Sequence, residues 1–350
     1  MHFYEYTGCL HVHTTYSDGE GCVADVAEAA RRAGVDFVVV NDHAHMTSSI
    51  HREEEAFYGD VLVMMDLEVG VRYNHYLAFD CRRMPEPRLA GGQEIIDEVA
   101  AAGGFGFLSH PFEKGMPLAG SVAYTWNDLD ATGFTGICFW NFSSRWKERI
   151  SGPVSGLVSI LFKSGLLRGP CSRTMTFWDS LCAQRRVSGI GGSDAHHWGY
   201  GVGPFRLRPL TYKYLLGAIT SHVLLDAPLP RDVAGARVVI CRALREGSIF
   251  VANDKIGDSR GFRLHFEADG GGFCGMGAER NFSTGVLDVK VPREGEIRLI
   301  RNGVVADRFR GTEKRIRIDS PGVYRIEVYR RKSLFGDRPW IFSNPVYLRP

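Results

Sequence analysis

The sequence lacks several features that would restrict its class at once. Its eight cysteines form no Cys-x-x-Cys pair, and several lie in apolar runs, so we expect reduced, buried thiols instead of disulfides or a structural zinc site. No apolar run approaches the ~18 residues that a membrane span needs. Residues 1–6 show no basic start followed by an apolar stretch, so we expect no signal peptide and a cytoplasmic location.

A strong excess of either charge is also missing. The 42 basic residues nearly balance the 40 acidic ones, which gives no reason to expect nucleic acid or an anionic membrane as a partner. A small phosphorylated substrate is still compatible, because it would be recognised locally. The sequence also has no Gly-rich phosphate loop and no Gly-x-Ser-x-Gly nucleophile elbow.

What the chain does have is a regular alternation of strands and helices over its first two thirds. Strands are expected at 10–14, 36–40, 61–67, 76–79, 105–108, 137–140 and 187–190, and helices at 23–33, 94–102 and 178–185. Such alternation favours an α/β fold with a parallel sheet or barrel, whose function lies at the carboxyl ends of the strands. The segment 149–170 interrupts the pattern and is expected to be an inserted helix, which either caps the site or packs outside.

The last hundred residues have a different pattern. Strand-like segments follow one another without helices, separated by Gly, Pro and Asn, as in Pro292–Gly295 and Asn302–Gly303. This pattern predicts a small antiparallel β-sandwich. We therefore expect two domains, a barrel over 1–256 and a β-sandwich-like domain over 257–350.

Histidines and carboxylates recur where the expected strands end. His11 and His13 are two residues apart in a strand, so both rings point to the same face, and the following turn returns Asp18 to the strand end. Further groups of this kind lie at the ends of later strands, namely His43, Glu68, His110, Asp194 and His196, and His75 lies just before the strand at 76–79. Burying so many such groups is costly unless they are paired or coordinated, so the pattern as a whole predicts a metal site.

These motifs, in this order, resemble those of the PHP (polymerase and histidinol phosphatase) superfamily. The resemblance covers about residues 8 to 200 and lies in the segments 11–19, 41–43, 68 with 75, 109–111 and 192–196. The C-terminal segment Arg338–Pro345 is similar to the end of the carbaryl-hydrolase-like branch. The resemblance implies a distorted seven-stranded β/α barrel, related to TIM barrels, that holds two or three divalent ions (Zn, Mn or Fe).

Carried onto this sequence, the resemblance implies three overlapping ligand sets. One ion would be held by His11, His13, Glu68 and Asp194, a second by Glu68, His75 and His110, and a third by Asp18, His43 and His196. We expect Glu68, Asp194 and His196 to be catalytic as well. Asn41 departs from the Thr that usually precedes Asp-His in the family, and Asp42 is expected to orient a neighbouring ligand.

The expected reaction is hydrolysis of an ester bond by a hydroxide that bridges the ions, with phosphoesters as the leading substrate class. A carboxyl-ester or carbamate hydrolase with the same centre is the alternative, and a non-catalytic metal- or carbohydrate-binding protein is a third hypothesis. Candidate helpers are His45 and His197 as general acids, Arg145, Lys147 and Arg173 as anion-binding groups, and Phe112, Trp140, Trp178 and Trp198 as an apolar lining; for all of them a plain structural role is the competing interpretation.

Overall fold

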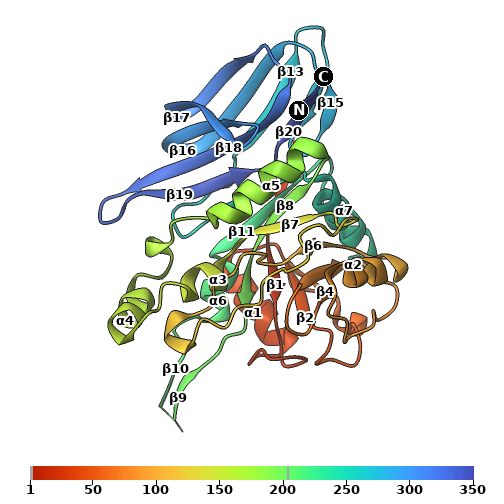
Figure 1. The fold of residues 1–350 in the computed structure, drawn as a ribbon, viewed down its shortest axis with the longest axis vertical. Helices are drawn as coiled ribbons and strands as arrows, with labels where there is room; N and C mark the ends of the chain where they lie inside the picture. The colour runs from red at the N-terminus through yellow and green to blue at the C-terminus, as the bar shows by residue number, and fades with distance from the viewer. Residues whose placement is uncertain (1–2, 203–204) are drawn as a thin grey trace.

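The computed structural model describes residues 3–202 and 205–350. Seven strands of this described chain close into a barrel (Figure 1). They are, in order around the barrel, β1 (Tyr4–Val12), β2 (Phe37–His43), β4 (Val61–Val69), β5 (Tyr76–Phe79), β6 (Phe105–Leu108), β7 (Gly136–Asn141) and β8 (Ser188–Ala195), which pairs back to β1. Short β3 (Ala56–Tyr58) lies beside β4.

The barrel is parallel except at one strand, which the sequence pattern did not reveal. β5 runs antiparallel to both β4 and β6. Residues 70–75 alone connect β4 to β5, whereas a parallel crossover needs a dozen or more residues, so the chain must reverse here. The other six strands therefore point their carboxyl ends to one end of the barrel, which β5 joins with its amino end.

Helices cover the outside of the barrel. In α1 (Val23–Ala33) the apolar positions recur at helical spacing and are buried, and the helix ends at Gly34, which takes the left-handed conformation with φ 76°. The remaining helices of the described barrel region are α2 (Gly92–Ala101), α3 (Phe142–Lys147), α4 (Pro153–Phe162), α5 (Ser172–Gln184), α6 (Tyr212–Leu216) and α7 (Val233–Glu246), with short 3-10 turns at Arg52–Glu54, Pro117–Ala119 and Lys163–Leu166. Among the described residues, no helix combines the length and apolar character of a membrane span.

The side chains of each barrel strand alternate between two cores. In β2, for example, Phe37 and Val39 belong to one cluster with α7, whereas Val38 and Val40 pack with α1. The first cluster fills the barrel interior. A floor of apolar side chains therefore underlies the strand ends at which the predicted ligands lie.

The C-terminal strands form a largely antiparallel sheet that continues from the barrel. β11 (Ile219–Leu225) pairs with β1, β12 (Ile249–Asn253) pairs with β11, and β12 also pairs with β19 (Gly336–Ser343). The remaining strands are β13 (Arg263–Ala268), β14 (Phe273–Gly275), β15 (Glu279–Asn281), β16 (Gly285–Arg301), β17 (Val304–Ile318), β18 (Gly322–Lys332) and β20 (Val346–Arg349). Their core includes Phe250 and Ala252 of β12, so this region shares apolar packing with the strands that adjoin the barrel.

The expected insertion contains α4, which lies beside the β18–β19 hairpin. Phe162 and Phe335 meet edge to face with their centroids 5.5 Å apart, and Arg338 Nε donates to the carbonyl of Gly165 at 2.7 Å. Figure 1 shows α4 at the same end of the barrel as the two-stranded ribbon of β9 (Tyr200–Val202) and β10 (Phe205–Leu207). The predicted boundary at 256/257 falls between β12 and β13 and stays a prediction, as does the sandwich arrangement.

Candidate metal centre

The ends of β1 and β8 leave regular strand geometry where the candidate ligands begin. His11 has φ 66°, His110 has φ 30° and Asp194 has φ 53°, which is unusual for residues with side chains. The pairing of β1 with both neighbours shifts its register across His11. Backbone strain of this kind costs on the order of 1–3 kcal/mol per residue and concentrates at functional sites.

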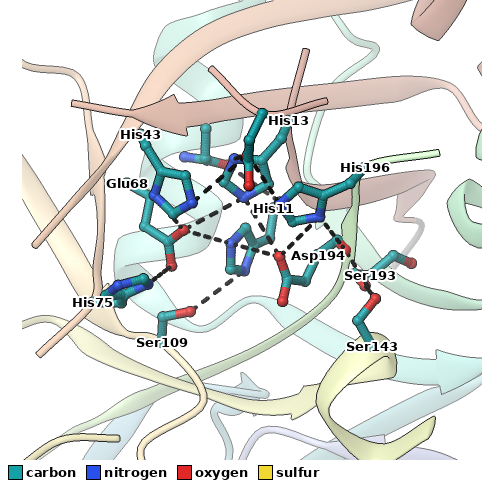
Figure 2. Close-up of polar contacts among 12 residues, drawn as sticks. His11, His13, His43, Glu68, His75, Ser109, Ser143, Ser193, Asp194 and His196 are labelled. Carbon is teal, nitrogen blue, oxygen red and sulfur yellow. Dashed lines mark hydrogen bonds and ion pairs between the residues drawn. The ribbon is translucent and has the colours of Figure 1, made fainter. Parts of the chain in front are cut away.

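Glu68, at the end of β4, lies among the candidate ligands, with His43 and His75 on either side of its carboxylate in Figure 2. Its side chain is buried, and its oxygens lie 3.1–3.4 Å from the nearest nitrogen of five imidazoles, those of His11, His13, His43, His75 and His110. Burial raises the pKa of Glu68, but the charges of His11 and His75 outweigh that effect and hold it well below the usual range. The carboxylate is therefore ionised and placed to bridge neighbouring ions.

Two aspartates face Glu68 across the cluster. Asp194 Oδ1 lies 3.4 Å from His11 Nε2 and 3.5 Å from both His13 Nε2 and His196 Nδ1. Asp18 Oδ1 lies 3.2 Å from His196 Nε2. Asp18 reaches this place because the chain turns tightly after β1; a Cβ on the next residue, Gly19, would meet the carbonyl oxygen of His13 at 2.3 Å.

All nine residues singled out as ligands converge at this one end of the barrel. Their ligand atoms form four overlapping groups with separations within 4.8 Å: His13, Asp18, His43 and His196; His11, His110 and Asp194; His11, His13 and Glu68; and His43, Glu68 and His75. The groups differ in detail from the sets that the resemblance implies. His13 also approaches Asp18, and His75 groups with His43, although His75 and His110 both lie next to Glu68 Oε1.

The donor atoms fit divalent cations. Within the described chain, buried nitrogens of four of these histidines and one oxygen of Glu68 make no hydrogen bond: His11 Nε2, His13 Nε2, His43 Nδ1, both nitrogens of His75, and Glu68 Oε1. A buried polar atom without a partner costs about 1–3 kcal/mol, so such a concentration calls for a ligand. Mixed imidazole and carboxylate donors suit Zn²⁺, Mn²⁺ or Fe²⁺.

Protonation in the ion-free cluster follows the same logic. Burial lowers the pKa of both His110 and His196, but carboxylates reverse the effect, raising the pKa of His110 to about 9 and that of His196 above its usual value. Burial lowers the pKa of His43 well below its usual range. Without a metal ion, protonated imidazoles therefore balance the charge of the buried carboxylates. Metal binding would release these protons.

Neighbouring groups hold the ligand-bearing loops in place. Asp42, which is expected to orient a neighbouring ligand, accepts hydrogen bonds from Thr14 N at 2.7 Å and from Ser17 Oγ at 2.5 Å. Ser17 Oγ in turn lies 3.4 Å from His13 Nδ1. Asn41 Oδ1 accepts from the backbone N–H of His11 at 3.2 Å. Asn41 and Asp42 therefore support the end of β1 through side chains that are themselves buried.

A cavity of about 220 Å³ opens over the cluster. Only some of the residues proposed as general acids, anion-binding groups or apolar lining face it. Lys147, His45, His197 and Trp198 line this cavity. Arg145 instead donates to the carbonyl of Gly169, Arg173 lies over the Phe112 ring, and Trp140 and Trp178 are fully buried core residues. Glu113, which also lines the cavity, was missed by sequence reasoning; its place three residues after His110 was the available signal.

Fold and site together define a barrel protein with a buried cluster of His, Asp and Glu side chains, which could hold metal ions, at the floor of a cavity. No family model matches the sequence, and no curated protein matches it. Among solved structures, the chain is similar to a two-domain protein from Bacteroides vulgatus ATCC 8482 described as containing a predicted PHP-like metal-dependent phosphoesterase. That similarity covers 98% of this chain and 95% of the other, with 14% identity and a TM-score of 0.44, so the chemistry is inferred here from the site itself.

Proposed function

We propose that this protein is a metal-dependent hydrolase of the PHP superfamily, most closely akin to its carbaryl-hydrolase-like branch, and that it acts on phosphoesters. The observation that carries the proposal is Glu68, which is buried among five imidazoles beneath an open cavity. Four of these imidazoles have buried nitrogens that make no hydrogen bond within the described chain. When bound, two or three divalent ions would lower the pKa of a coordinated water towards about 7 and offset negative charge on the substrate oxygens.

The roles proposed for the chain's own residues follow from their places. Glu68 and Asp194 are the two buried carboxylates that face one another across His11 and His13, so they are assigned as central ligands and catalytic residues. His196 contacts both Asp194 and Asp18 and lies at the cavity wall, where it can hold an ion and touch substrate.

The C-terminal β-rich region, proposed as a separate domain over 257–350, is assigned a supporting role. Its β18–β19 hairpin holds the insertion through Phe335 and Arg338. The insertion in turn follows α3, which carries Ser143 and Lys147 into the cavity wall. In this arrangement the β-rich region stabilises one side of the substrate cavity.

A carboxyl-ester or carbamate hydrolase is the second candidate, because apolar side chains such as Met46 and Trp198 also line the cavity. Rates on para-nitrophenyl phosphate, bis-(para-nitrophenyl) phosphate and para-nitrophenyl acetate, measured with and without a chelator, separate the candidates. We expect chelator-sensitive hydrolysis of at least one phosphate, absent in Asp194→Ala. Hydrolysis of the acetate alone would favour the second candidate, and bound metal without any hydrolysis would favour a binding protein.

A further inference from the structure

The cavity wall carries a single fixed positive charge. Of the described residues that line the cavity, Lys147 is the only lysine or arginine. It forms an ion pair with Glu113, whose side chain is fully buried, while its own side chain keeps 23% exposure. Glu113 is fixed in turn, because it accepts hydrogen bonds from Ser144 Oγ at 3.0 Å and Tyr124 N at 2.9 Å.

This pair places an ammonium group beside the metal centre instead of neutralising a surface charge. An ammonium has three N–H donors, and Glu113 Oε1 takes one of them, which leaves donors for a ligand in the cavity. Burial lowers the pKa of Lys147, but the Glu113 and Asp194 carboxylates raise it above its usual value, so the group stays charged. Glu113 also lies 3.9 Å from His110 Nδ1, which links the lysine to the ligand cluster.

The outer part of the same cavity is apolar. Met46 is 50% exposed, Val71 39% and Trp198 45%, and all three line the cavity. They come from the loops after β2, β4 and β8, so they surround the opening above the ligands. Exposed apolar side chains gathered around a polar floor indicate a ligand with one charged end and one apolar end.

The size of the cavity sets a further limit. Its volume of about 220 Å³ lies below the ~300 Å³ at which sites for drug-sized ligands begin. A phosphate group with one small ring or a short alkyl group suits this space.

We propose that the pocket takes a phosphate monoester of a small apolar alcohol, with the phosphate between the ligand cluster and Lys147 and the aryl or alkyl group against Met46, Val71 and Trp198. This inference rests on the proposed function and names its substrate class. The reaction is hydrolysis: water adds to phosphorus, the bond from phosphorus to the alcohol oxygen breaks, and that oxygen takes a proton, giving the alcohol and inorganic phosphate.

Calorimetric titration of the purified, metal-containing protein tests separately how the pocket binds the phosphate group and how it binds the apolar group. The ligands are inorganic phosphate, methylphosphonate and phenylphosphonate, none of which is hydrolysed. We expect phenylphosphonate to bind more tightly than methylphosphonate. Lys147→Met should weaken all three by about tenfold or more, as expected for loss of a charged hydrogen bond. Met46→Ser should weaken phenylphosphonate selectively, by about threefold to tenfold.

Variants of two exposed residues outside the cavity serve as controls. Lys114→Met removes an exposed lysine next to Glu113, and Leu118→Ser removes an apolar side chain that is 53% exposed; neither residue lines the cavity, and neither change should alter binding. Because Lys147→Met leaves Glu113 buried without its partner, the double variant Lys147→Met/Glu113→Gln provides a neutral pair of similar volume. It should show the same loss of phosphate binding.

Two results would overturn the inference: phosphate affinity unchanged in both Lys147 variants, or phenylphosphonate bound no more tightly than methylphosphonate. The failure of the proposed function looks different. If the protein hydrolyses no ester yet binds phosphonates with the expected dependence on Lys147 and Met46, the binding assignment stands and the hydrolase assignment falls. If it hydrolyses aryl phosphates while Lys147→Met binds phosphate normally, only the binding assignment falls.

Discussion

Within the part of the chain that the structure describes, we compare two buried clusters of histidine and carboxylate, which differ in how their polar atoms are satisfied. In the first, His222 of β11 lies between Glu5 and Asp254, with Nδ1 2.9 Å from Glu5 Oε1 and Nε2 3.0 Å from Asp254 Oδ2. Hydroxyl groups of Thr220 and Ser259 complete its surroundings. In the second, at the carboxyl ends of the barrel strands, several equally buried nitrogens have no hydrogen bond within the described chain.

The His222 cluster is complete within the protein, whereas the Glu68 cluster is the one proposed to bind metal. Both contain ionisable groups removed from water, so composition and burial alone do not distinguish them. What differs is partnership: the His222 cluster is complete without any ligand, whereas the Glu68 cluster gathers five imidazoles around one carboxylate. The first should govern stability, and the second should govern metal content and activity.

The largest effect on stability is expected from His222→Ala. The change leaves Glu5 and Asp254 buried without their shared partner, and breaking a buried ion pair costs about 3–5 kcal/mol of unfolding free energy. Denaturant unfolding measures the loss, with His265→Ala, a half-buried histidine in β13, as the control. Metal bound per folded chain should stay the same; a loss of metal with unchanged stability would reverse the assignments of the two clusters.

The pH dependence of stability offers a second distinction. Burial lowers the pKa of His222, but Asp254 and Glu5 reverse this and raise it to about 9. The imidazolium therefore contributes fully below pH ~6.5, the unfolded value, and its contribution is lost as pH rises to about 9. The difference in unfolding free energy between the wild type and His222→Gln should shrink over this window by on the order of 3 kcal/mol. A constant difference would mean that His222 is neutral in the folded protein.

A smaller effect is expected from Asp42→Ala, which leaves every candidate ligand in place. The variant loses the acceptor for Thr14 N and Ser17 Oγ, so the end of β1 is held less firmly. Loss of such supporting groups typically lowers metal affinity by about 10–100-fold. Competition with a chelator measures the change, and Asp97→Ala, on the exposed side of α2, is the control. Equal affinity in wild type and variant would remove Asp42 from the support of the site.

The sequence predicted secondary structure most accurately where the apolar pattern is regular and clearly bounded. Expected strands at 76–79 and 105–108 match β5 and β6, and the helix at 23–33 matches α1, because their apolar spacing is regular and clear breakers bound them. The sequence analysis did not assign β11, α7 or β12, so the continuity between the barrel and the β-rich region was not foreseen. That continuity depends on the long-range pairing of β12 with β19, which no local pattern reports.

For the candidate site, too, the sequence predicted some features, and others became visible only in the structure. Its nine ligand candidates were recognisable because each lies in or next to the end of an expected strand, but their grouping depends on local backbone geometry. His11 and Asp194 adopt a positive φ although neither is glycine, and no sequence pattern predicts this conformation. Lys147 could be named as one of three basic candidates, yet only the structure shows that Lys147, paired with Glu113, lines the cavity, whereas Arg145 and Arg173 do not.

The most direct test of the central claim is the metal content of the purified protein, measured by inductively coupled plasma mass spectrometry alongside Asp194→Ala and His222→Ala. The account predicts two or three divalent ions per wild-type chain, a loss of at least one in Asp194→Ala, and no loss per folded chain in His222→Ala. A folded wild-type protein that holds no stoichiometric zinc, manganese or iron, even after incubation with each, would contradict it.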